Sequence, residues 1–86
     1  MGGPLCESGD IFTQEEGGFV SRRPLPEAKV GDFLVIGCAG AYGYAMASNY
    51  NSKPLVAEVL IENGKPHLVR RRQTLEELIQ HEAVVR

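Results

Sequence analysis

The stretch Leu55–Arg71, LVAEVLIENGKPHLVRR, contains the strongest signal for local structure in the sequence. Two runs rich in β-favouring residues, Leu55–Glu62 and Lys65–Arg71, flank the dipeptide Asn63–Gly64. Asn-Gly is the preferred pair for a type I′ turn, because both turn positions require a positive φ. Pro66 has no amide proton, which favours an edge position for the second run. The stretch therefore predicts a two-stranded antiparallel hairpin.

A short helix is predicted after the hairpin. Thr74 and Glu77 have the spacing of a capping box, in which each side chain bonds to the other residue's backbone amide. Leu75, Leu78 and Ile79 form an apolar face at helical spacing. We expect this helix to be short and docked on a sheet.

Two further strands are predicted before the hairpin. Asp32–Cys38 is a continuous apolar run of strand length, typical of a buried strand. Leu5–Thr13 favours a strand that is interrupted at Ser8–Gly9. Together the segments predict an all-β (mainly β) fold, a small β-barrel or sandwich, formed by residues 1–86 as a single domain.

All three tyrosines lie in Ala39–Ser52, AGAYGYAMASNYNS, among small and polar residues. Tyr42, Met46 and Tyr50 recur every four residues, which predicts one face of a short helix after the turn that ends at Gly43. A glycine-bearing turn that leads into a helix exposes free amides, and the Tyr42 hydroxyl could donate to a phosphate there. A tight turn with packed tyrosines explains the same residues, and both interpretations remain open.

Composition excludes several classes of protein. The chain is 43% hydrophobic and 23% charged with a net charge of −2, so nothing favours nucleic acid as a partner. No apolar run approaches a membrane span, and no secretory signal is present. Two cysteines, Cys6 and Cys38, are too few for a disulfide scaffold. We therefore expect a cytoplasmic protein with reduced thiols.

The segment Cys6–Asp10, CESGD, is a candidate site. A thiol and a carboxylate are adjacent at Cys6 and Glu7, and a bulge at Gly9 could bring both to one rim of a sheet. The pair could act as a proton donor beside a cation-binding carboxylate. A half-buried cysteine beside solvated acids is the competing interpretation.

Other polar residues give weaker signals. His67 and His81 are too scattered for a metal site, and no metal is expected. Arg70–Arg72 is typical of a solvated strand edge or of a partner for local acids.

Three segments resemble a known family: GPLCESGDIFTQ (Gly3–Gln14), AGAYGYAMASNYNSKP (Ala39–Pro54) and RRRQTLEEL (Arg70–Leu78). They are similar, in the same order, to the C-terminal part of the diaminopimelate decarboxylases, which depend on pyridoxal phosphate and make lysine from meso-diaminopimelate. The likeness runs from Gly3 to about Glu82. The first two segments also resemble ornithine and arginine decarboxylases, whereas the last points to the diaminopimelate branch.

The resemblance implies a fold and assigns different functions to its two domains. The family joins an (α/β)8 barrel to a β-rich C-terminal domain, and the barrel carries the lysine that forms the Schiff base with pyridoxal 5′-phosphate. Lys29, Lys53 and Lys65 do not lie in that lysine's sequence context. The resemblance therefore implies a C-terminal domain whose barrel is absent, inactive alone and without tight cofactor binding. The parent could be monofunctional or fused to another enzyme such as an aspartate kinase.

The resemblance also assigns roles to candidate residues. It implies that Tyr42 contacts the cofactor phosphate and lies at the substrate site. It implies that Cys6 and Glu7 reach into the active site of a second subunit in a homodimer, where Glu7 holds the distal ammonium of the substrate and Cys6 is a candidate acid. The alternatives are a free-standing β module that binds a small anion or a protein partner, and the same domain of an ornithine/arginine-type decarboxylase.

Overall fold

The computed structural model describes residues 1–86, which divide into two compact units, Met1–Ile36 and Gly37–Arg86. The second unit contains all the regular elements: α1 (Gly40–Gly43), the 3₁₀ turn η1 (Tyr50–Ser52), β1 (Glu58–Glu62), β2 (Lys65–Arg70) and α2 (Leu75–Leu78). The first unit consists of turns and segments without regular secondary structure, with two isolated bridges. None of the helical elements has the length and apolar composition of a membrane span.

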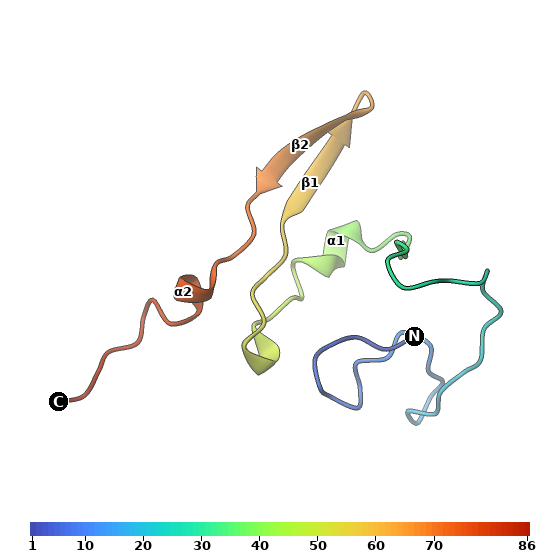
Figure 1. The fold of residues 1–86 in the computed structure, drawn as a ribbon, viewed down its shortest axis with the longest axis horizontal. Helices are drawn as coiled ribbons and strands as arrows, with labels where there is room; N and C mark the ends of the chain where they lie inside the picture. Colours follow the sequence, from blue (N-terminus) through green and yellow to red (C-terminus); the bar gives the residue numbers. More distant parts are fainter. The chain divides into compact units, whose positions relative to one another are not determined.

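The predicted hairpin is confirmed. Strands β1 and β2 pair antiparallel, and Figure 1 shows them as adjacent arrows joined by a tight turn. Asn63 and Gly64 occupy that turn with φ of 51° and 74°. Positive φ at both positions is the requirement of a type I′ turn, so the Asn-Gly pair fixes the hairpin locally.

A register shift at the base of the hairpin was not predicted. The pairing is regular from Glu62–Lys65 to Val59–Leu68, but the next residue, Glu58, pairs with Arg70. One extra residue is therefore accommodated in β2, which is the geometry of a bulge. As a consequence, an arginine lies opposite Glu58 where a regular ladder would place Val69.

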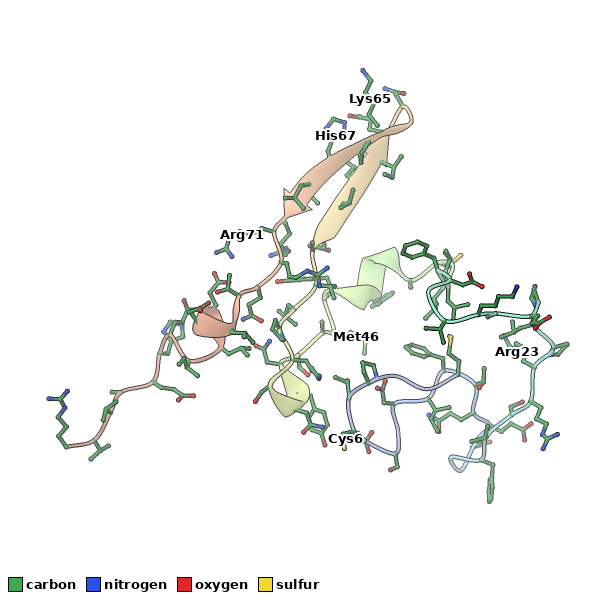
Figure 2. The ribbon with its side chains drawn as sticks, in the orientation of Figure 1. Cys6, Arg23, Met46, Lys65, His67 and Arg71 are labelled. Atoms are coloured by element: carbon green, nitrogen blue, oxygen red, sulfur yellow. The ribbon has the colours of Figure 1, made fainter.

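The hairpin carries an apolar face that this chain does not cover. Side chains alternate between the two faces of a strand, so Val59 and Ile61 share a face with their partners Leu68 and Pro66. Val59, Ile61 and Leu68 are between 53% and 66% exposed. The pairing places the charged Lys65 on the other face, and Figure 2 shows it near the turn. A single two-stranded hairpin is only marginally stable in water, so burial of its apolar face against another element would stabilise it.

The short C-terminal helix is confirmed together with its cap. Helix α2 begins after Thr74, whose side chain accepts a hydrogen bond from the Glu77 amide, while the Glu77 carboxylate accepts one from the Thr74 amide. These reciprocal bonds form the capping box that the spacing predicted.

The prediction of a helix after Gly43 is wrong. Helix α1 is the Gly40–Gly43 motif itself, closed by a hydrogen bond from the Gly43 amide to the Ala39 carbonyl. Turns follow at residues 44–46, and Asn51 inside η1 has a φ of 52°. Residues 47–49 have no helical structure, so Tyr42, Met46 and Tyr50 do not lie along one helical face.

The two strands predicted in the first half of the chain do not form regular ladders. Residues 32–36 have no regular secondary structure and no strand partner, and Leu5–Thr13 forms a loop closed by a single bridge between Gly2 and Ile11. A strand is defined by its partner, and an apolar run predicts a strand without supplying one. The mainly-β character of the chain therefore depends on the hairpin and the two bridges. The sheet has two strands and does not close into the expected barrel.

No side chain of the chain is buried, and the largest apolar residues are open to solvent. Phe33 and Val35, from the run that predicted a buried strand, are 97% and 90% exposed. Burial of a side chain of this size contributes about 1.5–3 kcal/mol of stability. The chain leaves that contribution unrealised at most of its apolar positions.

We expect Gly64→Ala to weaken the hairpin. An alanine in the left-handed region costs about 1–2 kcal/mol, so the ratio of paired to open hairpin should fall about 5- to 30-fold. Cross-strand proton contacts between Val59 and Leu68, measured by NMR on the 86-residue chain, report the paired form. Gly37→Ala is the matched control, since Gly37 has no positive φ and nothing lies within 4 Å of the added methyl group. Equal contacts in all three chains would contradict the assignment.

Candidate functional site

The CESGD segment forms a hydrogen-bonded loop. The amide of Gly3 donates to the Asp10 carbonyl at 2.7 Å, the Asp10 amide donates to the Glu7 carbonyl at 3.1 Å, and the Ile11 amide donates to the Gly9 carbonyl at 2.9 Å. The strand-like contact at Gly2 and Ile11 closes its base. A tight turn therefore replaces the strand that was expected here.

Cys6 occupies a strained position in this loop. Its φ is 54°, in the left-handed region that residues with a side chain rarely adopt. The thiol is free and exposed, and Figure 2 shows it on the loop of the first unit. Strained backbone of this kind is found preferentially at functional sites. The interpretation of Cys6 as a half-buried packing residue is not supported.

The Glu7 carboxylate is oriented by its own turn. One oxygen, Oε2, accepts a hydrogen bond from the Gly9 amide at 2.7 Å, and Oε1 accepts one from the Ser8 hydroxyl at 3.3 Å. An ionised carboxylate offers about four lone-pair positions, so acceptor capacity remains for a cation. Glu7 is exposed, and its carboxylate is therefore both pre-oriented and accessible.

Tyr42 lies in the middle of α1, and its side chain is 70% exposed. A methyl group added at Gly40 or Gly43 would meet nothing within 4 Å, so the backbone at these two glycines, which flank Tyr42 in the sequence, is open. A phenol hydroxyl in open surroundings can donate a hydrogen bond to a phosphate oxygen. These residues fit the phosphate end of a cofactor such as pyridoxal phosphate and offer nothing to its ring.

A second tyrosine makes a contact that was not predicted. The Arg70 guanidinium lies 3.9 Å from the centre of the Tyr44 ring, a cation–π geometry. The same guanidinium donates to Glu58 at 2.5 Å, and this hydrogen bond raises the pKa of Arg70. The contact depends on the bulge that places Arg70 opposite Glu58. A regular hairpin register, which is all that the sequence indicates, would not have revealed it.

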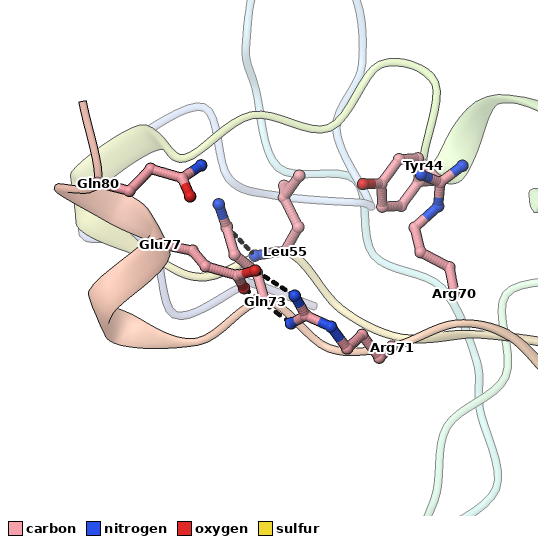
Figure 3. Close-up of a pocket in the computed structure, with 7 residues that line it drawn as sticks. All are labelled: Tyr44, Leu55, Arg70, Arg71, Gln73, Glu77 and Gln80. Carbon is pink, nitrogen blue, oxygen red and sulfur yellow. Dashed lines mark hydrogen bonds and ion pairs between the residues drawn. The ribbon is translucent and has the colours of Figure 1, made fainter.

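Arg71 and Glu77 form a bidentate ion pair in which the guanidinium donates to both carboxylate oxygens (Figure 3). The hydrogen bond from Arg71, and next the one from the Thr74 amide, lower the pKa of Glu77 from 4.5 to about 2. Beside them, Gln73 Oε1 accepts from the Leu55 amide at 2.9 Å. The expectation that the arginine run pairs with local acids is confirmed for Arg70 and Arg71.

These side chains line a cavity of about 340 Å³ in the second unit. Its lining residues are Tyr44, Leu55, Arg70, Arg71, Gln73, Glu77 and Gln80. Because both arginines are already paired with acids, the cavity presents no uncompensated charge to a ligand. We interpret it as part of the framework that joins α2 to the base of the hairpin.

The predicted site residues fall in both units of the chain. Cys6 and Glu7 are neighbours on the loop of the first unit, and Tyr42 lies in α1 of the second. No three His, Cys, Asp or Glu side chains gather closely enough to hold a metal ion. The chain therefore presents a thiol beside a carboxylate in one unit and an accessible phenol in the other.

Comparison with known proteins identifies the class to which these features belong. Residues 1–40 match the model of the pyridoxal-dependent decarboxylase C-terminal sheet domain. Diaminopimelate decarboxylase of Escherichia coli K12 is 63% identical over 79 residues, which are 92% of this chain and 19% of the relative. The enzymes of Streptomyces coelicolor and Bacillus subtilis are 54% and 45% identical, over 95% and 93% of this chain and 19% and 17% of their own lengths.

A solved structure agrees with the sequence matches. A crystal structure of diaminopimelate decarboxylase superposes with a TM-score of 0.89 at 63% identity, over 94% of this chain and 19% of that chain. The chain thus matches the C-terminal sheet domain of the pyridoxal-dependent decarboxylases over residues 1–40, and diaminopimelate decarboxylases over nearly its whole length. Within that family, the relatives named above are all diaminopimelate decarboxylases. The chain spans about a fifth of their length.

The Arg71–Glu77 pair gives a pH prediction. The pKa of Glu77 is about 2 in the folded chain, below its ordinary value of 4.5. The ion pair and cap are therefore fully present above pH 4.5, and their contribution is lost as the pH falls from 4.5 through 2. Carbon-13 NMR of the Glu77 carboxyl should show the low midpoint.

Two variants provide the contrast for this titration. Arg71→Gln removes the main cause of the shift and should move the Glu77 midpoint back toward 4.5. Arg72→Gln removes an adjacent charge that does not bond to Glu77 and should move it much less. A midpoint near 4.5 in the unmodified chain, or equal shifts in both variants, would show that the pair does not form in solution.

Proposed function

We propose that this chain forms part of the active site of a pyridoxal-phosphate-dependent decarboxylase that converts meso-diaminopimelate to lysine. The observation that carries the proposal is the 63% identity to a diaminopimelate decarboxylase over 92% of the chain. The local geometry supports it, because the CESGD loop carries an accessible thiol and an oriented carboxylate on adjacent residues.

The cofactor, when bound, supplies the electron sink that decarboxylation requires. This chain contributes at the phosphate end, where the Tyr42 hydroxyl donates a hydrogen bond to a phosphate oxygen. The open space at Gly40 and Gly43 lets the phosphate approach the backbone. Anchoring the phosphate fixes the position of the reacting centre, which is a large part of the catalytic contribution that a protein makes.

Glu7 and Cys6 act on the substrate. The remaining lone pairs of the Glu7 carboxylate accept a charge-assisted hydrogen bond from the distal ammonium of meso-diaminopimelate. The Cys6 thiol, on the neighbouring residue, delivers a proton to the reacting carbon. The two residues therefore divide substrate recognition and proton delivery between them.

The rest of the site lies outside this chain. We infer that an (α/β)8 barrel supplies the cofactor-binding lysine, and that Cys6 and Glu7 serve the active site of a second subunit in a homodimer. Both units of the chain would then belong to one C-terminal domain, whose sheet closes into a small barrel or sandwich when further strands pair with the open edges of the hairpin. We place the enzyme in the cytoplasm.

The proposal predicts the effect of Glu7→Gln in the full-length enzyme. Glutamine keeps the size of the side chain but lacks the charge, and a hydrogen bond to a charged group contributes about 1.5–3 kcal/mol. The substitution should lower kcat/KM for meso-diaminopimelate about 10- to 150-fold. Glu16→Gln, at an exposed acid of the first unit, is the matched control and should leave kcat/KM unchanged.

Cys6→Ala should separate the two roles. Proton delivery belongs to the chemical step, so this variant should reduce kcat with little change in KM. Assays with ornithine and arginine identify the substrate class in parallel. If Glu7→Gln leaves kcat/KM unaltered, or if ornithine or arginine is the better substrate of the unmodified enzyme, the proposed function is wrong.

Subunit mixing tests whether the site is shared. A Glu7→Gln subunit combined with a subunit that lacks the cofactor-binding lysine gives a heterodimer in which one site carries both defects and the other carries neither. Activity should therefore reappear on mixing. Heterodimers that form without recovering activity would place Glu7 in its own subunit's site.

A further inference from the structure

We infer that Asp10 is a positioning residue, which fixes the loop that presents Cys6 and Glu7. The inference rests on the proposed function, since it concerns how the reactive groups of that site are held. Asp10 is the last residue of the CESGD motif, and neither the thiol–carboxylate chemistry nor the cofactor contact requires it. Its carboxylate instead bonds within the loop.

Asp10 closes the loop with its side chain and both of its backbone groups. Its Oδ2 accepts a hydrogen bond from the Leu5 amide at 2.9 Å, its carbonyl accepts one from the Gly3 amide at 2.7 Å, and its amide donates to the Glu7 carbonyl at 3.1 Å. The contact with Leu5 is partly buried. The bonded positions lie on both sides of Cys6, so Asp10 holds both ends of the reactive dipeptide.

Gly3 and Asp10 are matched sterically. A methyl group added at Gly3 would overlap the Asp10 carboxylate, whose two oxygens and carbon are the nearest atoms. The carboxylate occupies the space that a side chain at position 3 would need. Gly3→Ala must therefore push the carboxylate away from the Leu5 amide, and it should reproduce the loss of the Asp10 side chain.

The backbone of the loop explains why the hydrogen bonds of Asp10, together called the clamp, are needed. Cys6 has a left-handed φ of 54°, a conformation that persists only where the surrounding structure enforces it. The Glu7 carboxylate is oriented by the amide of Gly9, which lies directly before Asp10. Without the Leu5–Asp10 bond, the segment between them can relax, and both reactive groups leave their places. Misplacement of such groups by about 1 Å can cost about 100-fold in rate.

The test is a double-mutant cycle in the full-length enzyme with meso-diaminopimelate. Asp10→Ala should lower kcat/KM about 10- to 100-fold, and Asp10→Asn, which keeps an oxygen acceptor for the Leu5 amide, should recover most of the loss. In a Glu7→Gln background, Asp10→Ala should cost less, because one of the two groups that it positions, the Glu7 carboxylate, is already gone. A residue that only maintained stability would give independent, multiplicative losses.

Asp32→Ala is the matched control. The Asp32 carboxylate also accepts from a backbone amide three residues earlier, that of Lys29 at 2.9 Å, but its turn carries no site residue. It should leave kcat/KM within about twofold of the unmodified enzyme. Should Asp10→Ala fail to fold, Gly3→Ala takes its place in the cycle.

The outcomes separate this inference from the proposed function. If Glu7→Gln is without effect, the function assigned to the loop fails. If Glu7→Gln lowers kcat/KM but the loss from Asp10→Ala multiplies with it fully, the function stands and Asp10 has no positioning role. A loss with Asp10→Ala that shrinks in the Glu7→Gln background and is recovered in Asp10→Asn supports the inference.

Discussion

Burial of apolar surface is the interaction on which the rest of this structure depends, and this chain does not complete it alone. The apolar run around Phe33 and Val35 and the apolar face of the hairpin are both open to solvent. Hydrogen bonds contribute about 0.5–1.5 kcal/mol each, which is similar to the entropy cost of ordering one residue. The turns, caps and ion pairs therefore determine the local conformation of each segment. The stability of the folded chain depends in addition on burial of its exposed apolar side chains.

The elements that sequence reasoning predicted correctly are those whose causes lie within a few residues. Asn63–Gly64 supplies both positive φ angles of its turn, and Thr74 and Glu77 satisfy each other's amides. The strand expected at Asp32–Cys38 depends on a partner that an apolar run does not specify, and here the run remains unpaired. The helix expected after Gly43 does not form, because helical structure ends in turns at residues 44–46, which the spacing of the tyrosines and Met46 does not reveal.

The candidate site likewise has features that the sequence reveals and features that only the structure reveals. Cys6 and Glu7 attract attention from the sequence as an adjacent thiol and carboxylate, and Tyr42 as a phenol between two glycines, but their proposed roles come from the family resemblance. The clamp formed by Asp10 depends on the closed conformation of the loop. The stacking of Arg70 on Tyr44 depends on a bulge. Neither can be deduced from residue type and spacing, because each requires the path of the backbone.

Functionally, the chain presents reactive groups on short, locally closed turns. The loop around Cys6 and the single helical turn around Tyr42 are each held by hydrogen bonds within about ten residues. Such turns keep their shape through local bonds, whereas their placement relative to one another and, under the proposed function, to a substrate depends on burial of the exposed apolar faces. Under the proposed function, substrate recognition and folding are coupled, because the surfaces that bury the apolar faces also complete the active site.

Amide hydrogen exchange tests this account most directly. The amides of Phe33–Ile36 and of the hairpin should be followed in the 86-residue chain and in a full-length decarboxylase that contains it. In the chain alone, residues 33–36 should exchange near the intrinsic rate, and in the full-length enzyme they should be protected by about 100-fold or more, because the apolar run is then buried. Equal protection of these amides in both proteins would contradict the account, since it would mean that the chain completes its own core.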